Sequence, residues 1–460
     1  MSMPEPSVWT DRFGRTHVEK SANVPDHDGD IPRVPGVPTD VEELLDEVAL
    51  GNLAVADLPP NPLVSGCGQE GMRDYTWLVE APEASAVLLW VNGIFNHGEL
   101  EHSEFERVAG DSLWALTLRL PASWLASYRI AVWEGEGLAP WRAATDRFAV
   151  RTAAMQLSSL DPRGGAVIGG SHGPSSLAAG PEAPAENWHV EVAAELASGT
   201  VHEHTFAATE RYGEQRVWVY QPGTIAAPGT ADGAEQGTDG AEPSVDGAAQ
   251  GAPTPLLILF DGQVWNKALG LPAILDAAIA GGVLPPLHVA MVDSVDMQIR
   301  WAELGVPSGQ VDFVLDELLD FVREHYPVSP ARDATVVSGQ SFGGLAAVWA
   351  LALGGDRIGH AIAQSPSLWR FDMADVLREQ PDWLSLHLQA GRFEGHMLTD
   401  AEALLDSLLE GSEGDAPAID SARPTGPSSR RVTLEPMDGG HDWAWWRPGL
   451  LNKLAELLGE

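Results

Sequence analysis

The segment from Thr335 to Ala350 constrains the fold of this chain more than any other. It begins with β-branched residues typical of a buried strand, continues into a Gly-x-Ser-x-Gly turn, and ends in an apolar run with helical character. This order is the sequence form of a nucleophile elbow: Gly339 and Gly343 relieve crowding in a sharp turn, and Ser341 projects its hydroxyl from the carboxyl edge of a sheet. The segment therefore predicts a nucleophilic serine, Ser341, in an α/β structure.

A second Gly-x-Ser-x-Gly pentapeptide occurs at Gly169-Gly170-Ser171-His172-Gly173. In a chain with 48 glycines the pentapeptide alone is a weak signal. This copy runs into Pro174 and two serines, with no helix-forming stretch behind it, so we interpret it as a loop. Only the copy around Ser341 has the strand and the helix that the motif needs.

The composition of the 460 residues indicates two or three globular domains. A formal charge of −39 argues against nucleic acids and anionic membranes as partners, and an anionic ligand would need local arginine or lysine. The single cysteine, Cys67, excludes a disulfide framework and a thiolate metal site. Because no apolar run reaches the length of a membrane span and the N-terminus lacks the apolar core of a signal peptide, we expect a cytoplasmic protein.

Short alternating runs dominate residues 71–195. Four of them have strand-like alternation and are separated by turn residues; they lie at 75–79, 86–91, 113–118 and 127–133. This spacing is typical of a β-sandwich whose tryptophans pack in the core. The preceding residues 1–70 are predicted to be a flexible leader followed by an edge helix.

Strands alternate with helices over most of residues 196–460, which predicts a mainly parallel sheet with helices on its faces. Besides the elbow strand, the predicted strands lie at 256–260, 287–292, 359–364, 384–389 and 432–435, and helices are predicted at 311–322 and 446–458. Low-complexity insertions occur near 224–253 and 411–430; the first is too poor in large apolar residues to order itself.

Ser341 needs a base and an orienting acid, since an unassisted hydroxyl is a weak nucleophile. In sheets that carry such an elbow, the chain order is serine, acid, histidine. His441 follows the last strand on a glycine loop and is the predicted base; His396 and a merely structural role for His441 remain open. Glu394 follows the preceding strand and is the predicted acid, with Asp400 as the alternative.

Asp438 and Asp442 flank His441 on its own loop, which makes them weaker candidates for the acid. The oxyanion that forms during attack needs two donors. We predict the backbone N–H of Phe342, directly after the nucleophile, and that of Gln263, in the loop after the first strand of this region. Removing one such donor costs about 3–4 kcal/mol of transition-state stabilisation.

With these residues assigned, the chain resembles the enterochelin (ferric enterobactin) esterases, within the esterase D-like branch of the α/β-hydrolases. The similarity covers roughly residues 70–460 apart from the two insertions, and it is specific as a combination. It is carried by Asp261-Gly262-Gln263, Arg300-x-x-Glu303-Leu304, Gly339-Gln340-Ser341-Phe342-Gly343-Gly344, the Ala390-Gly391 to Glu394 loop, Asp438-Gly439-Gly440-His441-Asp442 with Trp446-Arg447, and in the N-terminal region Trp90-Val91-Asn92-Gly93, Leu120-Pro121-Ala122-Ser123-Trp124 and Ser127-Tyr128-Arg129.

The resemblance implies an α/β-hydrolase domain with an N-terminal Ig-like β-sandwich, and a serine esterase that cleaves the trilactone ester bonds of a ferric catecholate siderophore such as enterobactin in the cytoplasm. It implies no metal in bond breaking, iron being cargo in the substrate. It assigns Ser341, His441 and Glu394 as nucleophile, base and acid. Arg300 would face the anionic iron–catecholate, with a salt bridge to Glu303 as the alternative, and Trp369 would be an aromatic near the site.

Two departures from the family pattern bear on the siderophore. The linker motif is reduced to Asp161-Pro162-Arg163-Gly164-Gly165, and Ser365-Pro366 replaces a more usual Gly-Ser form. Two other hypotheses stay open on the sequence. One is an esterase of the same fold acting on another small acyl or acyl-sugar ester, and the other is a siderophore-binding protein without turnover.

Overall fold

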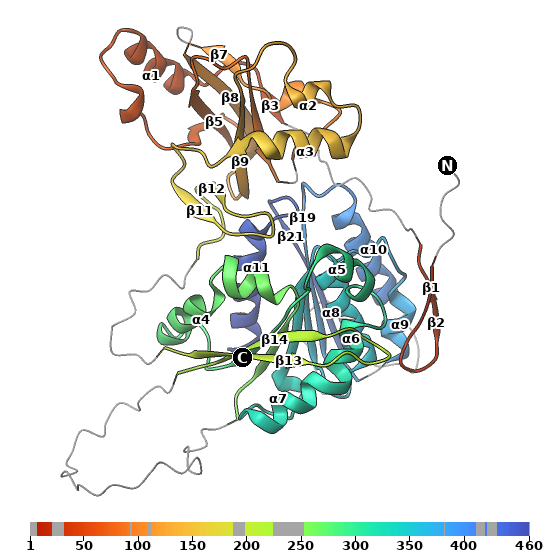
Figure 1. Ribbon diagram of the computed structural model, residues 1–460. Helices are drawn as coiled ribbons and strands as arrows, with labels where there is room; N and C mark the ends of the chain where they lie inside the picture. The colour runs from red at the N-terminus through yellow and green to blue at the C-terminus, as the bar shows by residue number, and fades with distance from the viewer. Residues whose placement is uncertain are drawn as a thin grey trace, which may run out of the picture.

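The computed structural model describes residues 7–20, 32–92, 94–108, 112–186, 198–223, 253–380, 382–410, 419–420 and 430–459. Within these residues the chain builds two five-stranded sheets from its N-terminal part and one nine-stranded sheet from its C-terminal part. The N-terminal part lies above the C-terminal part in Figure 1. The low-complexity insertions predicted near 224–253 and 411–430 fall almost wholly outside the described residues.

The two N-terminal sheets are antiparallel and share one core. The first contains β3(Arg33–Val34), β4(Leu63–Gly66), β5(Met72–Glu80), β7(Glu106–Val108) and β8(Leu113–Pro121), and the second contains β6(Ala86–Val91), β9(Leu125–Trp133), β10(Ser158–Ser159), β11(Ala166–Ile168) and β12(Ser175–Ala179). Trp77 of β5 meets Tyr128 of β9 edge-on, with ring centroids 5.7 Å apart. All four strands predicted in this region lie within β5, β6, β8 and β9. The predicted tryptophan core is confirmed at Trp77 and Trp124, both fully buried.

Helices cover the outer faces of both N-terminal sheets. The predicted edge helix is α1(Thr39–Ala49), whose Val41 and Leu45 pack against strands of the first sheet. On the second sheet, α2(Pro140–Ala143) and α3(Arg147–Leu157) bury Trp141 and Val150 against β6 and β9. Asp146 caps α3 by accepting a hydrogen bond from the N–H of Ala149 at 3.0 Å.

The C-terminal sheet is mixed, with strand order β13-β14-β16-β15-β17-β18-β19-β21-β20. The strands are β13(Thr200–Phe206), β14(Gln215–Gln221), β15(Leu256–Leu259), β16(His288–Val292), β17(Thr335–Gln340), β18(His360–Gln364), β19(Ser385–Gly391), β20(Ile419–Asp420) and β21(Arg430–Met437). β13 and β14 pair antiparallel at one edge, and β16 to β20 run parallel. The order reverses at β15, between β16 and β17, and such a switch point opens a crevice at the carboxyl ends of the strands.

Helices pack on both faces of this sheet. α4(Leu271–Ala280) and α11(Trp443–Leu458) share one core with it, and α6(Gln310–Phe313), α7(Leu319–His325), α8(Phe342–Leu353), α9(Ala374–Glu379) and α10(Met397–Glu410) share the other. α5(Met297–Glu303) lies between β16 and α6 in the chain. The helix predicted at 311–322 is a helical run from α6 to α7 with a π-helical segment, Val314–Leu318, in its middle. α11 begins three residues before the predicted closing helix because Asp442 caps its N-terminus.

The prediction of a flexible leader is wrong for the described residues 7–20. β1(Val8–Thr10) and β2(Thr16–Val18) pair as a hairpin that lies beside α9 in Figure 1. After the hairpin, Glu19 accepts a hydrogen bond from Nε of Arg370 at 2.6 Å, and both side chains are almost fully buried. The Arg370 guanidinium also lies 5.3 Å from the ring centroid of Phe342. The N-terminal segment is therefore bound to the core beside the elbow.

Replacing Glu19 by alanine is expected to lower the free energy of unfolding by about 3–5 kcal/mol, because it leaves the buried Arg370 guanidinium without its carboxylate. Urea denaturation followed by circular dichroism measures the change. The matched control is Glu379→Ala. Glu379 also pairs with an arginine, Arg15, but its side chain is 60% exposed, so its loss should cost less than about 1 kcal/mol. Equal effects of the two substitutions would contradict the prediction.

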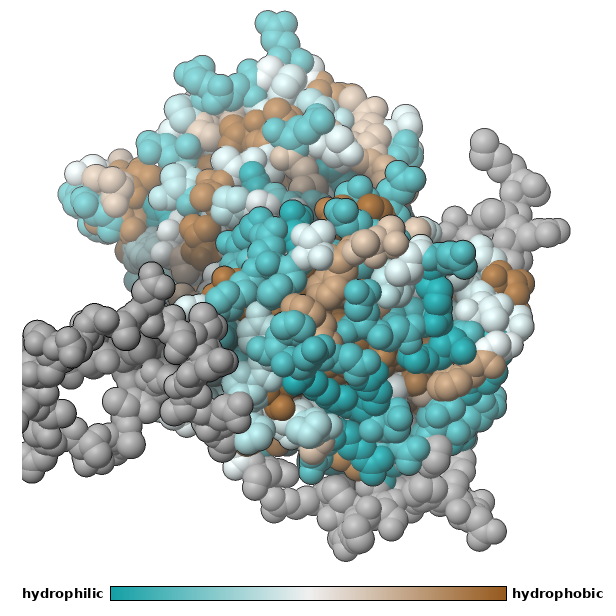
Figure 2. Space-filling model, turned by 60° about the horizontal axis from the view of Figure 1, so that its bottom comes forward, coloured by the Kyte–Doolittle hydropathy of each residue, from teal (hydrophilic) through white to brown (hydrophobic). Residues whose placement is uncertain are grey.

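The molecular surface in Figure 2 is mostly hydrophilic on the face turned to the viewer, with hydrophobic residues scattered over it. Among the described helices, none combines the length and the apolarity that crossing a bilayer would need.

Candidate active site

Ser341 lies on a sharp turn between β17 and α8. Its backbone has φ 59° and ψ −116°, a conformation that a residue with a side chain rarely adopts. The turn forms because glycines surround it: a Cβ on Gly339 would lie 2.4 Å from the carbonyl carbon of Gly343. The N–H of Ser341 donates to the carbonyl of Gln364 at 3.0 Å, which fixes the turn on the neighbouring strand. This is the strand–turn–helix geometry that the sequence predicted around Ser341.

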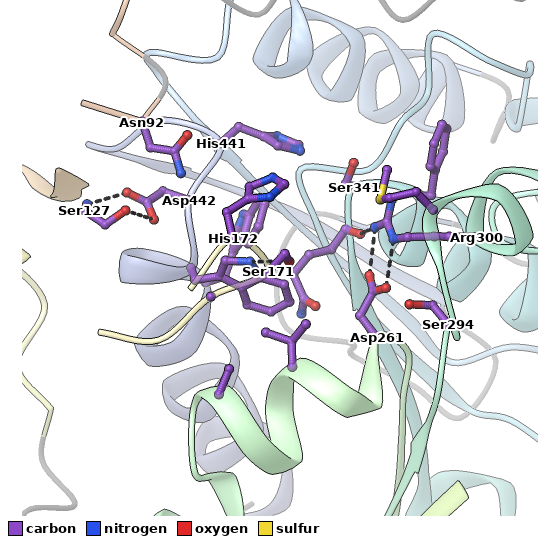
Figure 3. Close-up of a pocket in the computed structure, with 18 of the residues that line it drawn as sticks. Asn92, Ser127, Ser171, His172, Asp261, Ser294, Arg300, Ser341, His441 and Asp442 are labelled. Atoms are coloured by element: carbon purple, nitrogen blue, oxygen red, sulfur yellow. Dashed lines mark hydrogen bonds and ion pairs between the residues drawn. The ribbon is translucent and has the colours of Figure 1, made fainter. Parts of the chain in front are cut away.

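The turn opens into a cavity of about 680 Å³ between the N-terminal part and the carboxyl edge of the large sheet (Figure 3). Its walls include all the predicted site residues except Glu394, which is fully buried behind them. These residues are Ser341, Phe342, Gln263, Arg300, Trp369 and His441.

His441 follows β21 and borders the same cavity as Ser341. Its ring meets Trp446 of α11 edge-on, with centroids 4.7 Å apart. Burial, together with the positive charges of Arg300 and Arg151, lowers the pKa of His441 to about 3. The imidazole is therefore neutral at pH 7, the state in which a general base accepts a proton.

Glu394 lies behind His441, with 3.8 Å between its Oε1 and the Nδ1 of the imidazole. The same Oε1 accepts a hydrogen bond from Ser365 Oγ at 2.7 Å, and Ser365 Oγ in turn accepts one from Trp446 Nε1 at 2.9 Å. Burial raises the pKa of Glu394 well above its usual range, while hydrogen bonds from Ser365 and Gly391 oppose that shift. Ser365, noted in the sequence only as a departure from the family pattern, thus holds the carboxylate in place.

The alternative pair, His396 and Asp400, lies elsewhere. Their side chains contact each other at 2.7 Å at the start of α10, and neither is among the residues that line the cavity. Asp438 and Asp442, the weaker candidates on the histidine loop, contact the N-terminal part: Ser123 donates to Asp438, and Ser127 donates to Asp442. The structure brings His441 and Glu394 together, and His441 lines the same cavity as Ser341.

The predicted oxyanion donors come from two neighbouring turns. Phe342 begins α8, and Gln263 follows β15. The Gln263 side chain is tied to Ser294 at both ends: its Nε2 donates to Ser294 Oγ at 2.6 Å, and its Oε1 accepts from Ser294 N at 3.1 Å. A side chain held in this way fixes the backbone that carries the predicted N–H donor.

The main contact of Arg300 is with Asp261 and not with Glu303, the alternative partner that the sequence suggested. Its guanidinium forms two 2.8 Å hydrogen bonds with the carboxylate of Asp261 (Figure 3). Glu303, the alternative partner, instead accepts from the N–H of Gly213 at 3.0 Å. Asp261 has a positive φ of 57° and begins the turn that carries Gln263, so the pair buttresses that turn. Arg300 still lines the cavity, and its role towards substrate stays a prediction.

Trp369 lies on the wall next to Phe342, with ring centroids 5.9 Å apart. Among the residues that the structure describes, no group of three or more histidine, cysteine, aspartate or glutamate side chains is arranged to hold a metal ion.

Sequence reasoning missed the N-terminal wall of the cavity. Trp90, Asn92, Ser127 and Arg151 line it, and so does the loop Gly169–Gly173, which was interpreted only as a loop. Ser171 of that loop accepts a hydrogen bond from Trp443 Nε1 at 3.2 Å. Figure 3 shows Ser171 and His172 at the cavity together with Ser341. Residues so distant in the sequence carried no signal that they share one site.

Both parts of the chain match models of known families. Residues 73–189 match the model described as "Enterochelin esterase, N-terminal", and residues 243–457 match the model described as "Putative esterase". The iron(III) enterobactin esterase of Escherichia coli strain K12 is 26% identical over 407 residues, which cover 84% of this chain and 89% of the relative. The iron(III) salmochelin esterase of E. coli O6:H1 is 26% identical over 446 residues, covering 92% and 98%.

Two solved structures show the same fold. The ferric enterobactin esterase of Salmonella typhimurium superimposes with a TM-score of 0.65 at 24% identity, covering 86% of this chain and 96% of that one. The enterobactin esterase of Shigella flexneri in the presence of enterobactin gives 0.62 at 24% identity, covering 86% and 95%. The mixed sheet with helices on both faces is thus an α/β-hydrolase-type fold, as predicted for the C-terminal part.

Proposed function

Because the chain belongs to the enterochelin esterase family, we propose that it is a serine esterase that hydrolyses the trilactone ester bonds of a ferric catecholate siderophore such as enterobactin. One observation carries the proposal. A serine on a strained turn and a neutral imidazole border one cavity, and a buried carboxylate lies behind the imidazole. Nucleophile, base and orienting acid are the parts that acyl transfer requires.

The reaction proceeds in two steps. His441 takes the proton of Ser341 as its oxygen attacks the ester carbonyl carbon, and the N–H groups of Phe342 and Gln263 stabilise the resulting oxyanion. The intermediate collapses, His441 returns the proton to the departing alkoxide, and the acyl group remains on Ser341. Water then attacks the acyl-enzyme with His441 as base again, which frees the carboxylate product. Glu394 orients the imidazole and stabilises its charged form.

The substrate's charge matters in a protein with a net charge of −39. A ferric catecholate is anionic, so the global field opposes its approach and local cations must offset it. Arg300 and Arg151 both line the cavity, and the positive charge of each lowers the pKa of His441. Trp369 supplies an aromatic face for a catechol ring. Iron enters only as cargo of the substrate.

Further parts of the proposal rest on the family and on the sequence. We assign an Ig-like sandwich to the N-terminal domain, with domain limits at 71–195 and 196–460, and a cytoplasmic location. The strongly negative charge supports the absence of nucleic-acid and membrane partners.

The proposal is tested by incubating the purified chain with ferric and iron-free enterobactin and resolving the products by mass spectrometry. We expect linear products that differ from the trilactone by one water for each ester cleaved, down to dihydroxybenzoylserine. An aryl ester of a short fatty acid serves as the competing substrate. Fast cleavage of the aryl ester with an intact trilactone would favour the alternative, an esterase for another small acyl or acyl-sugar ester.

A further inference from the structure

The loop that carries His441 is attached to the N-terminal part on both sides of the histidine. Before it, the carbonyl of Asp438 accepts a hydrogen bond from the N–H of Leu125 at 3.0 Å. After it, the carboxylate of Asp442 accepts two hydrogen bonds from Ser127, one from the backbone N–H and one from Oγ at 2.9 Å. The imidazole is thus on a short loop whose two ends are bound to β9. Figure 3 shows the attachment through Asp442 and Ser127.

Asp442 is the stronger of these two attachments. Its side chain is fully buried, and its carboxylate also caps α11 by accepting from the N–H of Ala444 at 3.0 Å. Burial raises its pKa to about 6, although hydrogen bonds from Ser127, Ala444 and Asn92 act to lower the pKa. Most of these donors belong to the N-terminal part. A buried carboxylate is costly unless its donors are in place, so this contact has one well-defined geometry.

The hydrogen bonds from Ser127 hold Asp442, the residue next to the proposed base. His441 directly precedes Asp442, so a movement of the carboxylate carries the imidazole with it. On the other side of the loop, the carbonyl of Gly439 accepts from the N–H of Phe393, next to Glu394, at 3.1 Å. The loop is thus held between the acid's turn and the N-terminal sheet. Near the reacting atoms, misplacement of a catalytic group by 1 Å costs about 10²-fold in rate.

We propose that Asp442 and Ser127 are positioning residues, through which the N-terminal sheet sets the place of the His441 imidazole relative to Ser341. The N-terminal part then serves the chemical step as well as forming a wall of the cavity. This inference rests on the proposed function, since it takes His441 as the base. A contact that only joined the two parts would change stability and leave kcat unaltered.

The test uses the full-length chain with Asp442→Asn, which keeps the shape but places an amide among donors, and with Ser127→Ala, which removes the hydroxyl alone. We expect kcat to fall about 10²-fold in Asp442→Asn and about tenfold in Ser127→Ala, with KM within about threefold of wild type. Ser127→Thr restores a hydroxyl and should recover most of the loss. Thermal unfolding of each variant shows whether the fold is kept.

The matched control is Glu186→Gln. Glu186 also joins the N-terminal part to α11, through a 2.8 Å hydrogen bond from Nε of Arg447, a residue outside the loop 438–442. We expect this variant to lower the unfolding temperature as much as Ser127→Ala does, with kcat unchanged. Equal kcat in wild type, Asp442→Asn and Ser127→Ala would overturn the inference while leaving the proposed function intact.

A second readout separates the inference from the choice of substrate. The rate at which a fluorophosphonate labels Ser341 depends on the base and needs no siderophore. Slower labelling of Asp442→Asn than of Glu186→Gln supports the inference even if wild type leaves the trilactone intact, in which case only the substrate assignment fails. If wild type is not labelled at Ser341, His441 does not activate it, and the proposed mechanism and the inference both fail.

Discussion

Replacement of Ser341 by alanine will reduce kcat for ester hydrolysis by about 10⁶-fold, the size of loss seen when the serine of a catalytic triad is removed. The alanine variant has no oxygen to attack the carbonyl, so His441 and Glu394 have no proton to move. The expected residual rate is that supplied by the oxyanion donors and by substrate binding. Product formation from ferric enterobactin, followed by chromatography, measures the change.

The chain contains its own control for this substitution. Ser171 lies in the other Gly-x-Ser-x-Gly pentapeptide and lines the same cavity, but its hydroxyl contacts Trp443 and its backbone belongs to a loop. Ser171→Ala is therefore expected to lose far less activity than Ser341→Ala. Hydrolysis near the wild-type rate in Ser341→Ala, or a comparable loss in Ser171→Ala, would remove Ser341 from the role of nucleophile.

Replacement of Glu394 by glutamine will reduce kcat by about 10⁴-fold, the effect of converting the acid of a triad to its amide. An amide cannot stabilise the imidazolium that forms in the transition state, and its N–H₂ group favours the wrong tautomer of His441. The glutamine is close in shape and keeps an oxygen to accept from Ser365, so the variant should fold. The assay is the same as for Ser341, with circular dichroism to check the fold.

Asp400→Asn is the matched control, because Asp400 contacts His396 at 2.7 Å and does not line the cavity. It should leave kcat unchanged. A loss in Asp400→Asn with full activity in Glu394→Gln would transfer the role of acid to Asp400. Full activity in both variants would mean that Ser341 and His441 work as a dyad.

Much of the fold could be predicted because its signals are local. The buried strands of the large sheet are runs of β-branched and apolar residues, and each predicted strand lies on or beside an observed one. Chain order then favoured His441 as the base and Glu394 as the acid, because parallel strands bring their carboxyl ends to one edge of the sheet. The N-terminal hairpin could not be predicted, because residues 7–20 lack an apolar stripe of their own and are held by a contact between Glu19 and Arg370, 351 positions away.

The partner of Arg300 shows the same limit. Glu303 was a reasonable candidate because residues three apart are neighbours on a helix. The structure instead pairs Arg300 with Asp261, 39 positions earlier, since both side chains reach the crevice at the switch point of the sheet.

By itself, the sequence determined the elbow and the chain order of the proposed catalytic groups. The glycines around Ser341 allow the sharp turn of the elbow. A parallel sheet brings the loops that follow its strands to the same edge. Only the tertiary structure decided what surrounds those groups. Ser127 and Asp442 are 315 positions apart, and the loop at Gly169–Gly173 enters the cavity from the N-terminal part. Such contacts form when two regions, each with its own hydrophobic pattern, pack against each other. Contacts between regions do not show in the hydrophobic periodicity of either region.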